Sequence, residues 1–170
     1  MWMSDGPPGT ALVVGLGSPL MGDDGIGLAA LARLREAWSL PRTVELLDGG
    51  TWGLNLLPAI ESAEQVLILD AVRAGRRPGT LAQLRREELP RMLGVKLSPH
   101  QIGLQEVLAL LELRGAVPAE MACLGLEPAS IELRHGLSPR VATRLDALAT
   151  AAARRLRGWG HRVQRRRVYA

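Results

Sequence analysis

The chain has 170 residues, of which 47% are hydrophobic, and it contains four Trp, one Tyr and no Phe. This length suits one sizeable core and is short for two, and aliphatic side chains must fill that core. The single cysteine, Cys123, excludes an internal disulfide framework and a cysteine-based zinc cluster, and we expect it in the core. Without an apolar run of about 18 residues or a leader-like start, we expect a cytoplasmic protein with no membrane anchor.

The formal charge of +4 comes from one end of the chain. Residues 154–170 hold seven Arg and no acidic residue, which leaves 14 basic and 17 acidic residues, a charge of −3, in residues 1–153. Because no nucleic-acid-binding motif accompanies this basic run, we interpret it as a solvated, frayed end and expect no nucleic-acid partner. We therefore expect a flexible N-terminus at residues 1–10, a single α/β domain at residues 11–153 and a basic tail at residues 154–170.

Apolar runs alternate with segments of helical spacing along the chain. Continuous runs such as QVLILDAV at residues 65–72 predict buried strands, and apolar residues three and four apart predict helices. In chain order we expect a strand at residues 11–16, a helix at 26–38, a strand at 43–47, a short helix at 52–60, a strand at 65–72, an alternating edge strand at 80–84, a helix at 98–113, a strand at 119–127 and a long helix at 138–156.

Three of these helices begin with capping residues. Thr51 is expected to cap the short helix, and Ser138-Pro139 is expected to open the last one. The segment Ser98-Pro99-His100-Gln101 combines an N-cap serine, a proline at the first helical position and a glutamine three residues after the serine.

The alternation of strands and helices along the chain predicts a mainly parallel, twisted sheet of about five strands with helices on both faces. In such α/β folds, ligands gather at the carboxyl ends of the strands.

The loop after the first strand superficially resembles two nucleotide-binding loops. A dinucleotide-binding fingerprint needs a glycine where Leu20 stands. A P-loop needs Lys and Ser or Thr where Asp23 and Asp24 stand, and these carboxylates would repel a phosphate. One acid at a helix start has a purely structural explanation, because it suits the helix dipole. The second is left to face the cleft, where a carboxylate can bind a divalent metal.

Asp70 and His100 add two further chemical groups at expected strand and helix ends. Asp70 interrupts a buried apolar run, so its carboxylate either serves a site or accepts hydrogen bonds from nearby backbone amides. His100 lies in the first turn of a helix, where the dipole favours the neutral imidazole that a metal needs; the alternative is a capping or surface histidine. Together with Asp24 these residues form a candidate divalent-metal site. We assign no site role to His135 or His161.

Four motifs occur in a fixed order. They are Gly15-Leu16-Gly17-Ser18-Pro19-Leu20-Met21-Gly22-Asp23-Asp24-Gly25-Ile26-Gly27, Asp48-Gly49-Gly50-Thr51, Ile68-Leu69-Asp70-Ala71-Val72 and Ser98-Pro99-His100-Gln101. In order and spacing this set resembles the hydrogenase maturation proteases, the endopeptidases that trim the large subunits of nickel–iron hydrogenases. The resemblance runs from about Leu12 to about Leu148. The chain departs from the usual family pattern at Ser18-Pro19, where Gly-Asn is common, and at Asp24, where many members have Glu.

The resemblance implies a three-layer α/β/α fold and removal of a short C-terminal peptide from a large-subunit precursor after nickel insertion. It also implies that Asp24, Asp70 and His100 contact nickel, which the precursor supplies and the enzyme does not hold permanently. Asp48 matches a further acid implicated in function in this family. We expect a cytoplasmic monomer whose partner is the precursor.

The chain lacks the motifs of serine and cysteine proteases and the His-Glu-x-x-His motif of zinc proteases. We hypothesise that Asp24, Asp70 and His100 engage nickel held by the precursor's cysteines, so that a carboxylate-positioned water attacks the scissile carbonyl. Asp48 or Asp23 is the candidate general base or orienting residue. The alternatives are a nickel-dependent chaperone that binds the precursor without cutting it and a flavodoxin-like ligand-binding domain.

Overall fold

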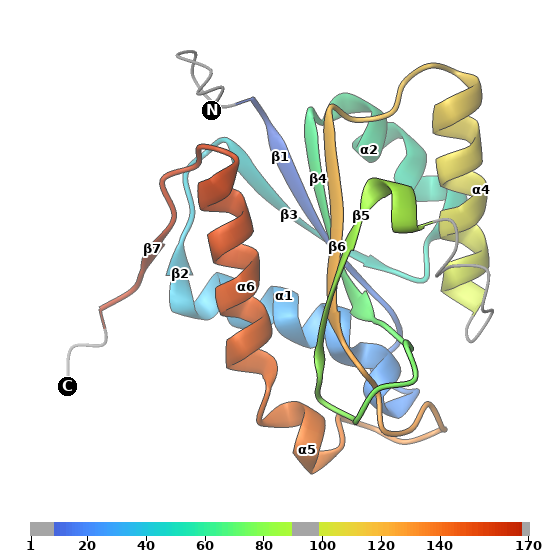
Figure 1. The fold of residues 1–170 in the computed structure, drawn as a ribbon, viewed down its shortest axis with the longest axis vertical. Helices are drawn as coiled ribbons and strands as arrows, with labels where there is room; N and C mark the ends of the chain where they lie inside the picture. The colour runs from blue at the N-terminus through green and yellow to red at the C-terminus, as the bar shows by residue number, and fades with distance from the viewer. Residues whose placement is uncertain (1–8, 90–98, 168–170) are drawn as a thin grey trace.

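A computed structural model describes residues 9–89 and 99–167, which form a five-stranded sheet between two layers of helices (Figure 1). The strands of this sheet are β1 (Ala11–Leu16), β3 (Val44–Gly50), β4 (Gln65–Ala71), β5 (Leu81–Arg85) and β6 (Glu120–Leu126). The helices are α1 (Ile26–Ala37), α2 (Leu57–Ser62), α4 (Pro99–Leu113), α5 (Pro139–Ala142) and α6 (Leu145–Gly158), with short 3-10 turns η1 (Gly22–Gly25), η2 (Gly53–Leu56) and η3 (Arg86–Glu88). Two short strands, β2 (Trp38–Ser39) and β7 (Gln164–Arg165), pair outside the sheet.

The strand order is β3-β1-β4-β6-β5. The first four strands in this order run parallel to their neighbours, whereas β5 is antiparallel to β6 and lies at the edge. This confirms the expected α/β/α architecture with a mainly parallel sheet of five strands. The expected edge strand at residues 80–84 is also confirmed, as β5. The antiparallel direction of β5 follows from the short segment, Val72 to Thr80, that joins it to β4. A crossover to a parallel strand needs a dozen or more residues.

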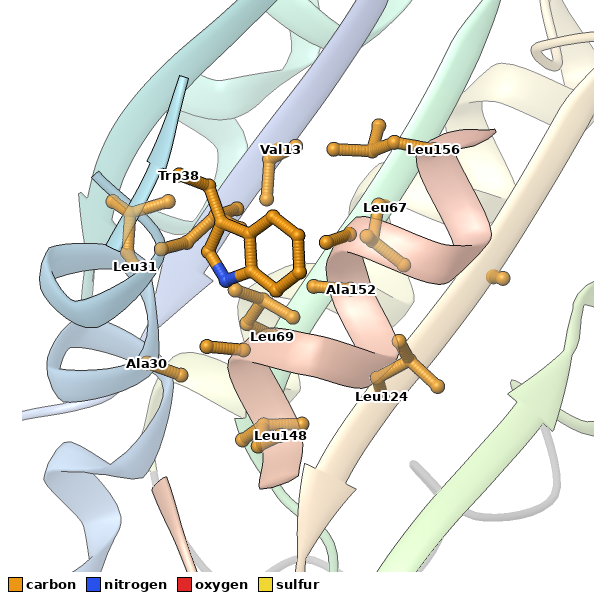
Figure 2. Close-up of a cluster of buried hydrophobic side chains, with 14 of the residues drawn as sticks. Val13, Ala30, Leu31, Trp38, Leu67, Leu69, Leu124, Leu148, Ala152 and Leu156 are labelled. Carbon is orange, nitrogen blue, oxygen red and sulfur yellow. The ribbon is translucent and has the colours of Figure 1, made fainter. Parts of the chain in front are cut away.

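Alternate residues of the central strands fill two separate cores. Val13, Leu67 and Leu124 pack with α1 and α6 on one face, where Leu148, Ala152 and Leu156 complete the cluster (Figure 2). Val14, Ile68 and Cys123 face α2 and α4 on the other. Because both faces are covered, the central strands are almost continuously apolar, with Asp70 of β4 as the buried exception, and such runs are typical of buried strands. Cys123 is in the core, as expected.

The single helix expected at residues 138–156 is wrong, because the chain breaks it into α5 and α6. At the break, the Thr143 hydroxyl donates a hydrogen bond to the Arg140 carbonyl at 2.8 Å. In a continuous helix that carbonyl would accept from the amide of Arg144, which instead bonds Val141 O at 2.9 Å. Thr51 as an N-cap is also wrong, since the chain first turns and η2 begins at Gly53 without a side-chain cap.

The basic end of the chain is not a solvated tail over its described part, up to residue 167. Residues 154–158 belong to α6, and Leu156 and Val163 are buried. Strand β7 pairs with β2, and the guanidinium groups of Arg157 and Arg165 lie 5.1 and 5.8 Å from the centroid of the Trp38 ring. The apolar residues between the arginines bury surface area, and two of the arginines, Arg157 and Arg165, stack on the face of the Trp38 ring. The expected boundary at residue 153 therefore falls inside a helix.

His161 attaches this C-terminal segment to the sheet. It is 3% exposed, and its Nε2 lies 2.6 Å from Gln65 Oε1 while its Nδ1 lies 2.9 Å from the Thr43 hydroxyl. Since the amide oxygen of Gln65 only accepts, Nε2 carries the proton and Nδ1 accepts from Thr43. Burial lowers the pKa of His161, which favours this neutral form.

Two expectations fall outside the described residues. The flexible N-terminus was expected at residues 1–10, of which only the last two are described, and the N-cap Ser98 precedes the described part of α4. Within the described residues, no helix combines the length and apolarity needed to cross a membrane.

Candidate active site

The carboxyl ends of β1 and β4 lie side by side at the centre of the sheet. Leu69 pairs with Gly15, so Asp70 comes at the point where β1 leaves the sheet. The loop that follows β1 leads through η1, which contacts the end of β4, into α1. Asp24 in η1 and Asp70 in β4 therefore belong to the same edge, as the alternation of strands and helices predicted.

A close approach of backbones at Gly27 holds this arrangement. A Cβ atom at this position would lie 2.7 Å from the amide nitrogen of Leu16 and would overlap the carbonyl oxygens of Leu16 and Leu69. Only glycine allows the first turn of α1 to rest directly on the ends of β1 and β4. The second glycine of the Gly25-Ile26-Gly27 segment is thus a packing residue that fixes where η1, and with it Asp24, enters the site.

Asp24 and Asp70 are both buried, at 2% and 3% exposure. Oδ2 of Asp24 accepts the backbone N–H of Ser18 at 2.9 Å, and Oδ1 of Asp70 accepts that of Ala71 at 2.8 Å. Asp70 follows Ile68 by two residues, and side chains two apart share a face, so it points to the layer of α2 and α4. Burial raises the pKa of the Cys123 thiol well above its ordinary value, and the negative charge of Asp70 adds to this effect.

His100 is the second residue of α4, whose first turn comes to the same edge of the sheet. A Cβ on Gly103, one turn further along, would lie 2.5 Å from the Cα of Gly53, so α4 and η2 meet without side chains between them. The side chain of His100 lies outside the described residues. Among the described side chains, no three His, Cys, Asp or Glu groups are placed to hold a metal ion. The metal-contacting trio therefore stays a prediction, with its two carboxylates placed at one edge.

Asp48 lies near the end of β3, the edge strand beside β1. It pairs with Gly15, and the register then shifts so that Leu16 pairs with Gly50, which leaves a bulge directly after Asp48. The Asp48 side chain is exposed. It is thus a carboxylate open to solvent next to two buried ones.

Asp23 has a role that the sequence left open. It is 1% exposed, and its carboxylate accepts four hydrogen bonds: from the backbone N–H of Ala129, Ser130 and Ser138 and from the Ser138 hydroxyl, at 2.8, 3.3, 2.7 and 2.9 Å. These bonds tie residues 129–138, which follow β6, to the loop that carries Asp24. Asp23 is therefore a structural anchor. Of the two neighbouring acids, Asp23 and Asp24, it is the one with the structural role that the sequence led us to expect for one of them.

Glu127 is a buried acid to which the sequence analysis gave no role. It is 4% exposed, and its Oε2 accepts the backbone N–H of Ala74 at 2.7 Å. Its own backbone bonds Thr80 and Gly79. Glu127 thereby shapes the loop that leaves β4 after Asp70. The available signal was an acid at the end of a buried apolar run, which is similar to the signal that singled out Asp70.

The fold and this edge define a three-layer α/β/α protein whose acidic residues gather at the carboxyl ends of central parallel strands. A family model described as hydrogenase maturation protease matches residues 29–155. The chain belongs to the hydrogenase maturation protease family, and it is a hydrolase of the endopeptidase type.

Similar proteins agree with this assignment. The chain is 42% identical over 158 residues to the hydrogenase expression/formation protein HupD of Rhodobacter capsulatus, covering 92% of this chain and 75% of that protein. It is 38% identical over 136 residues to the hydrogenase 2 maturation protease of Escherichia coli, covering 79% and 83%. The solved structure of the hydrogenase maturating endopeptidase HybD from E. coli superposes with a TM-score of 0.88 at 35% identity, covering 92% of this chain and 98% of that one.

Proposed function

We propose that this protein removes a short C-terminal peptide from the large-subunit precursor of a nickel–iron hydrogenase after nickel has been inserted. The observation that carries the proposal is the pair of buried carboxylates, Asp24 in the loop after β1 and Asp70 at the end of β4, in a chain of the maturation protease family. Burial of two acids at one edge is costly unless they serve a cation or hydrogen-bond donors. We infer the cytoplasm as the compartment and a monomer as the active form.

Nickel belongs to the substrate in this proposal. Carboxylate oxygens and an imidazole nitrogen suit a divalent first-row ion, so Asp24, Asp70 and His100 would recognise nickel that the precursor already holds. Asp70 points to the layer that contains α4, and His100 lies in the first turn of that helix. Recognition of the metal would dock the precursor and bring its C-terminal segment to the carboxyl edge of the sheet.

Hydrolysis requires a base for the attacking water, and Asp48 is the better placed of the two acids considered. Asp23 uses its oxygens to accept four hydrogen bonds, whereas Asp48 is exposed beside β1. The water oxygen bonds to the scissile carbonyl carbon while a carboxylate takes one water proton. The carbon–nitrogen bond then breaks, and that proton passes to the leaving amine.

The experiment incubates the protein with candidate large-subunit precursors, with and without nickel, and follows cleavage by gel mobility and by mass spectrometry of the released peptide. We expect cleavage only of the nickel-loaded form. A shift in mobility without a released peptide would support the chaperone alternative. Equal cleavage of nickel-free precursor would refute metal recognition while leaving the endopeptidase activity in place.

Substitutions then test the residues. Asp24→Asn, Asp70→Asn and His100→Gln should each abolish processing, and Asp48→Asn should lower the rate without loss of precursor binding. Asp146→Asn, an exposed carboxylate on α6, is the matched control. Circular dichroism checks that each variant is folded. Full cleavage by folded Asp24→Asn, Asp70→Asn or His100→Gln would reject the role of the trio.

A further inference from the structure

Two adjoining hollows lie along β5, the edge strand beside β6, and share Leu81. One, of about 360 Å³, lies between β5 and α6. The other, of about 400 Å³, lies between the start of β5 and the segment from α5 to the start of α6. We call both together the arginine groove, after the five arginines that line it: Arg77, Arg140, Arg144, Arg154 and Arg155.

The positive charge of this groove is not compensated within the described part of the chain. No described residue that lines either hollow is acidic. Over residues 9–89 and 99–167, none of the five arginines forms an ion pair; only Arg144 is engaged, through a hydrogen bond from its Nε to Gly79 O at 3.3 Å. Five like charges on one surface attract an anionic occupant, and guanidinium groups pair with carboxylates through two parallel hydrogen bonds.

The groove begins close to the candidate active site. Asp70 pairs with Gly125 in β6, and the next residue of β6, Leu126, pairs with Leu81. Neighbouring strands are about 4.8 Å apart, so Leu81 lies roughly 10 Å from the end of β4. An extended chain advances about 3.3 Å per residue and would cover this distance in about three residues. Leu81 packs against the core on the α1 and α6 face, whereas Asp70 points to the α2 and α4 face, so a substrate bound at Asp70 would reach the arginine groove by passing over the carboxyl ends of the strands.

The shape of the groove suits a polypeptide. Among the described residues, strand β5 pairs only with β6 and is the last strand of the sheet, so the outer side of β5 could take an added strand. Leu81 and Gln83 of β5 line the hollow beside α6, which gives the groove a partly apolar floor. Over five residues β5 spans about 16 Å, the length of a peptide segment of roughly five residues.

We propose that the arginine groove binds an acidic segment of the precursor protein and so orients the precursor at the active site. The identity of this partner rests on the proposed function, whereas the preference for an acidic peptide rests on the groove alone. An acidic peptide is favoured over a nucleic acid because the groove combines arginines with an edge strand and opens at the carboxyl edge of the sheet, where Asp24 and Asp70 also lie.

The first test measures peptide binding without catalysis. The groove variant Arg77→Gln/Arg140→Gln/Arg154→Gln/Arg155→Gln spares Arg144, whose hydrogen bond supports the fold. The control variant Arg35→Gln/Arg42→Gln/Arg162→Gln/Arg167→Gln removes the same charge from four exposed arginines outside the groove. Fluorescence anisotropy compares a labelled octaglutamate peptide, an octaglutamine peptide and an eight-nucleotide oligothymidylate at 50 and 500 mM salt.

We expect the wild type and the control variant to bind octaglutamate alike, and the groove variant to bind it about tenfold more weakly, because each exposed pair contributes a factor of about two. High salt should weaken the wild-type complex, and octaglutamine should not bind. Equal loss in the groove and control variants would overturn the proposal, since binding would then follow net charge alone. Tighter binding of the oligothymidylate than of octaglutamate would assign the groove to nucleic acid instead.

The second test uses a precursor that the wild-type protein cleaves. The groove variant should raise KM about tenfold while kcat stays unchanged, because no groove residue touches the scissile bond. A wild-type KM in the groove variant would refute the proposal. If the wild type cleaves no precursor, the proposed function fails, and the octaglutamate measurement still decides whether the groove binds acidic peptides.

Discussion

Replacement of Asp23 by Asn tests how the structure holds the active-site loop. Oδ2 of Asp23 accepts three hydrogen bonds and Oδ1 accepts one, from the backbone N–H of Ser138 at 2.7 Å. The amide of Asn has one oxygen and one NH2 group, so at least one buried donor loses its acceptor and meets another donor. A hydrogen bond to a charged group contributes about 1.5–3 kcal/mol, and an unsatisfied buried donor costs about 1–3 kcal/mol. We therefore expect the free energy of unfolding to fall by about 2–4 kcal/mol.

Urea denaturation followed by circular dichroism measures this loss, and thermal unfolding should show a Tm lower by about 5–15 °C. Limited proteolysis should cut the segment 129–138 faster in Asp23→Asn. Asp146→Asn is the matched control, because it removes a carboxylate whose ion pair with Arg33, at 2.6 Å, is exposed and screened by solvent. If Asp23→Asn unfolds at the same urea concentration as this control, the argument that Asp23 anchors the loop is wrong.

Three further predictions concern single residues. Gly27→Ala should lower the free energy of unfolding by about 1–3 kcal/mol in urea, because its Cβ would lie 2.7 Å from Leu16 N, whereas Gly158→Ala, with nothing within 4 Å, should not. Because burial lowers the pKa of His161 in the folded protein, this histidine takes up a proton at a higher pH in the unfolded chain than in the folded one. Its contribution to the free energy of unfolding is therefore complete above about pH 6.5 and falls below that pH, by at most about 1.4 kcal/mol per pH unit. Urea titrations from pH 8 to pH 5 should show this loss in the wild type, and an equally steep loss in His161→Gln would contradict it. The Cys123 thiol, whose pKa is raised by burial, should react with iodoacetamide only after unfolding, and rapid labelling of the native protein would place it outside the core.

Much of the fold follows from patterns that are local in the sequence. The strand expected at residues 65–72 is β4, Gln65–Ala71, and it was predictable because a strand buried on both faces forms a nearly continuous apolar run, here broken only by Asp70. The shared edge of Asp24 and Asp70 also follows, since parallel strands have all their carboxyl ends at one edge of the sheet. By contrast, the helix break near Thr143 coincides with a side-chain hydrogen bond to Arg140 O and a changed backbone bond of Arg144, which a helical pattern of apolar residues does not encode.

The C-terminal segment shows the limit of composition as a guide. Seven arginines and no acid predicted solvation, yet Leu156 and Val163 bury apolar area and Arg157 lies over the Trp38 ring. The partner that makes this packing possible, Trp38, lies more than a hundred residues earlier in the chain. Net charge reports solubility and long-range attraction, and it says little about how the stems of individual arginines pack.

The sequence by itself determined the order of strands and helices, the edge at which the acids gather and the family of the protein, because each depends on local periodicity or on short motifs. Only the tertiary structure decided that Asp23 is an anchor, since its donors in Ala129 and Ser138 are 106 and 115 residues away. The arginine groove likewise exists only in three dimensions, because it joins arginines from the loop before β5 and from α5 and α6. Contacts between distant segments depend on how elements pack, and no spacing within one segment reports them.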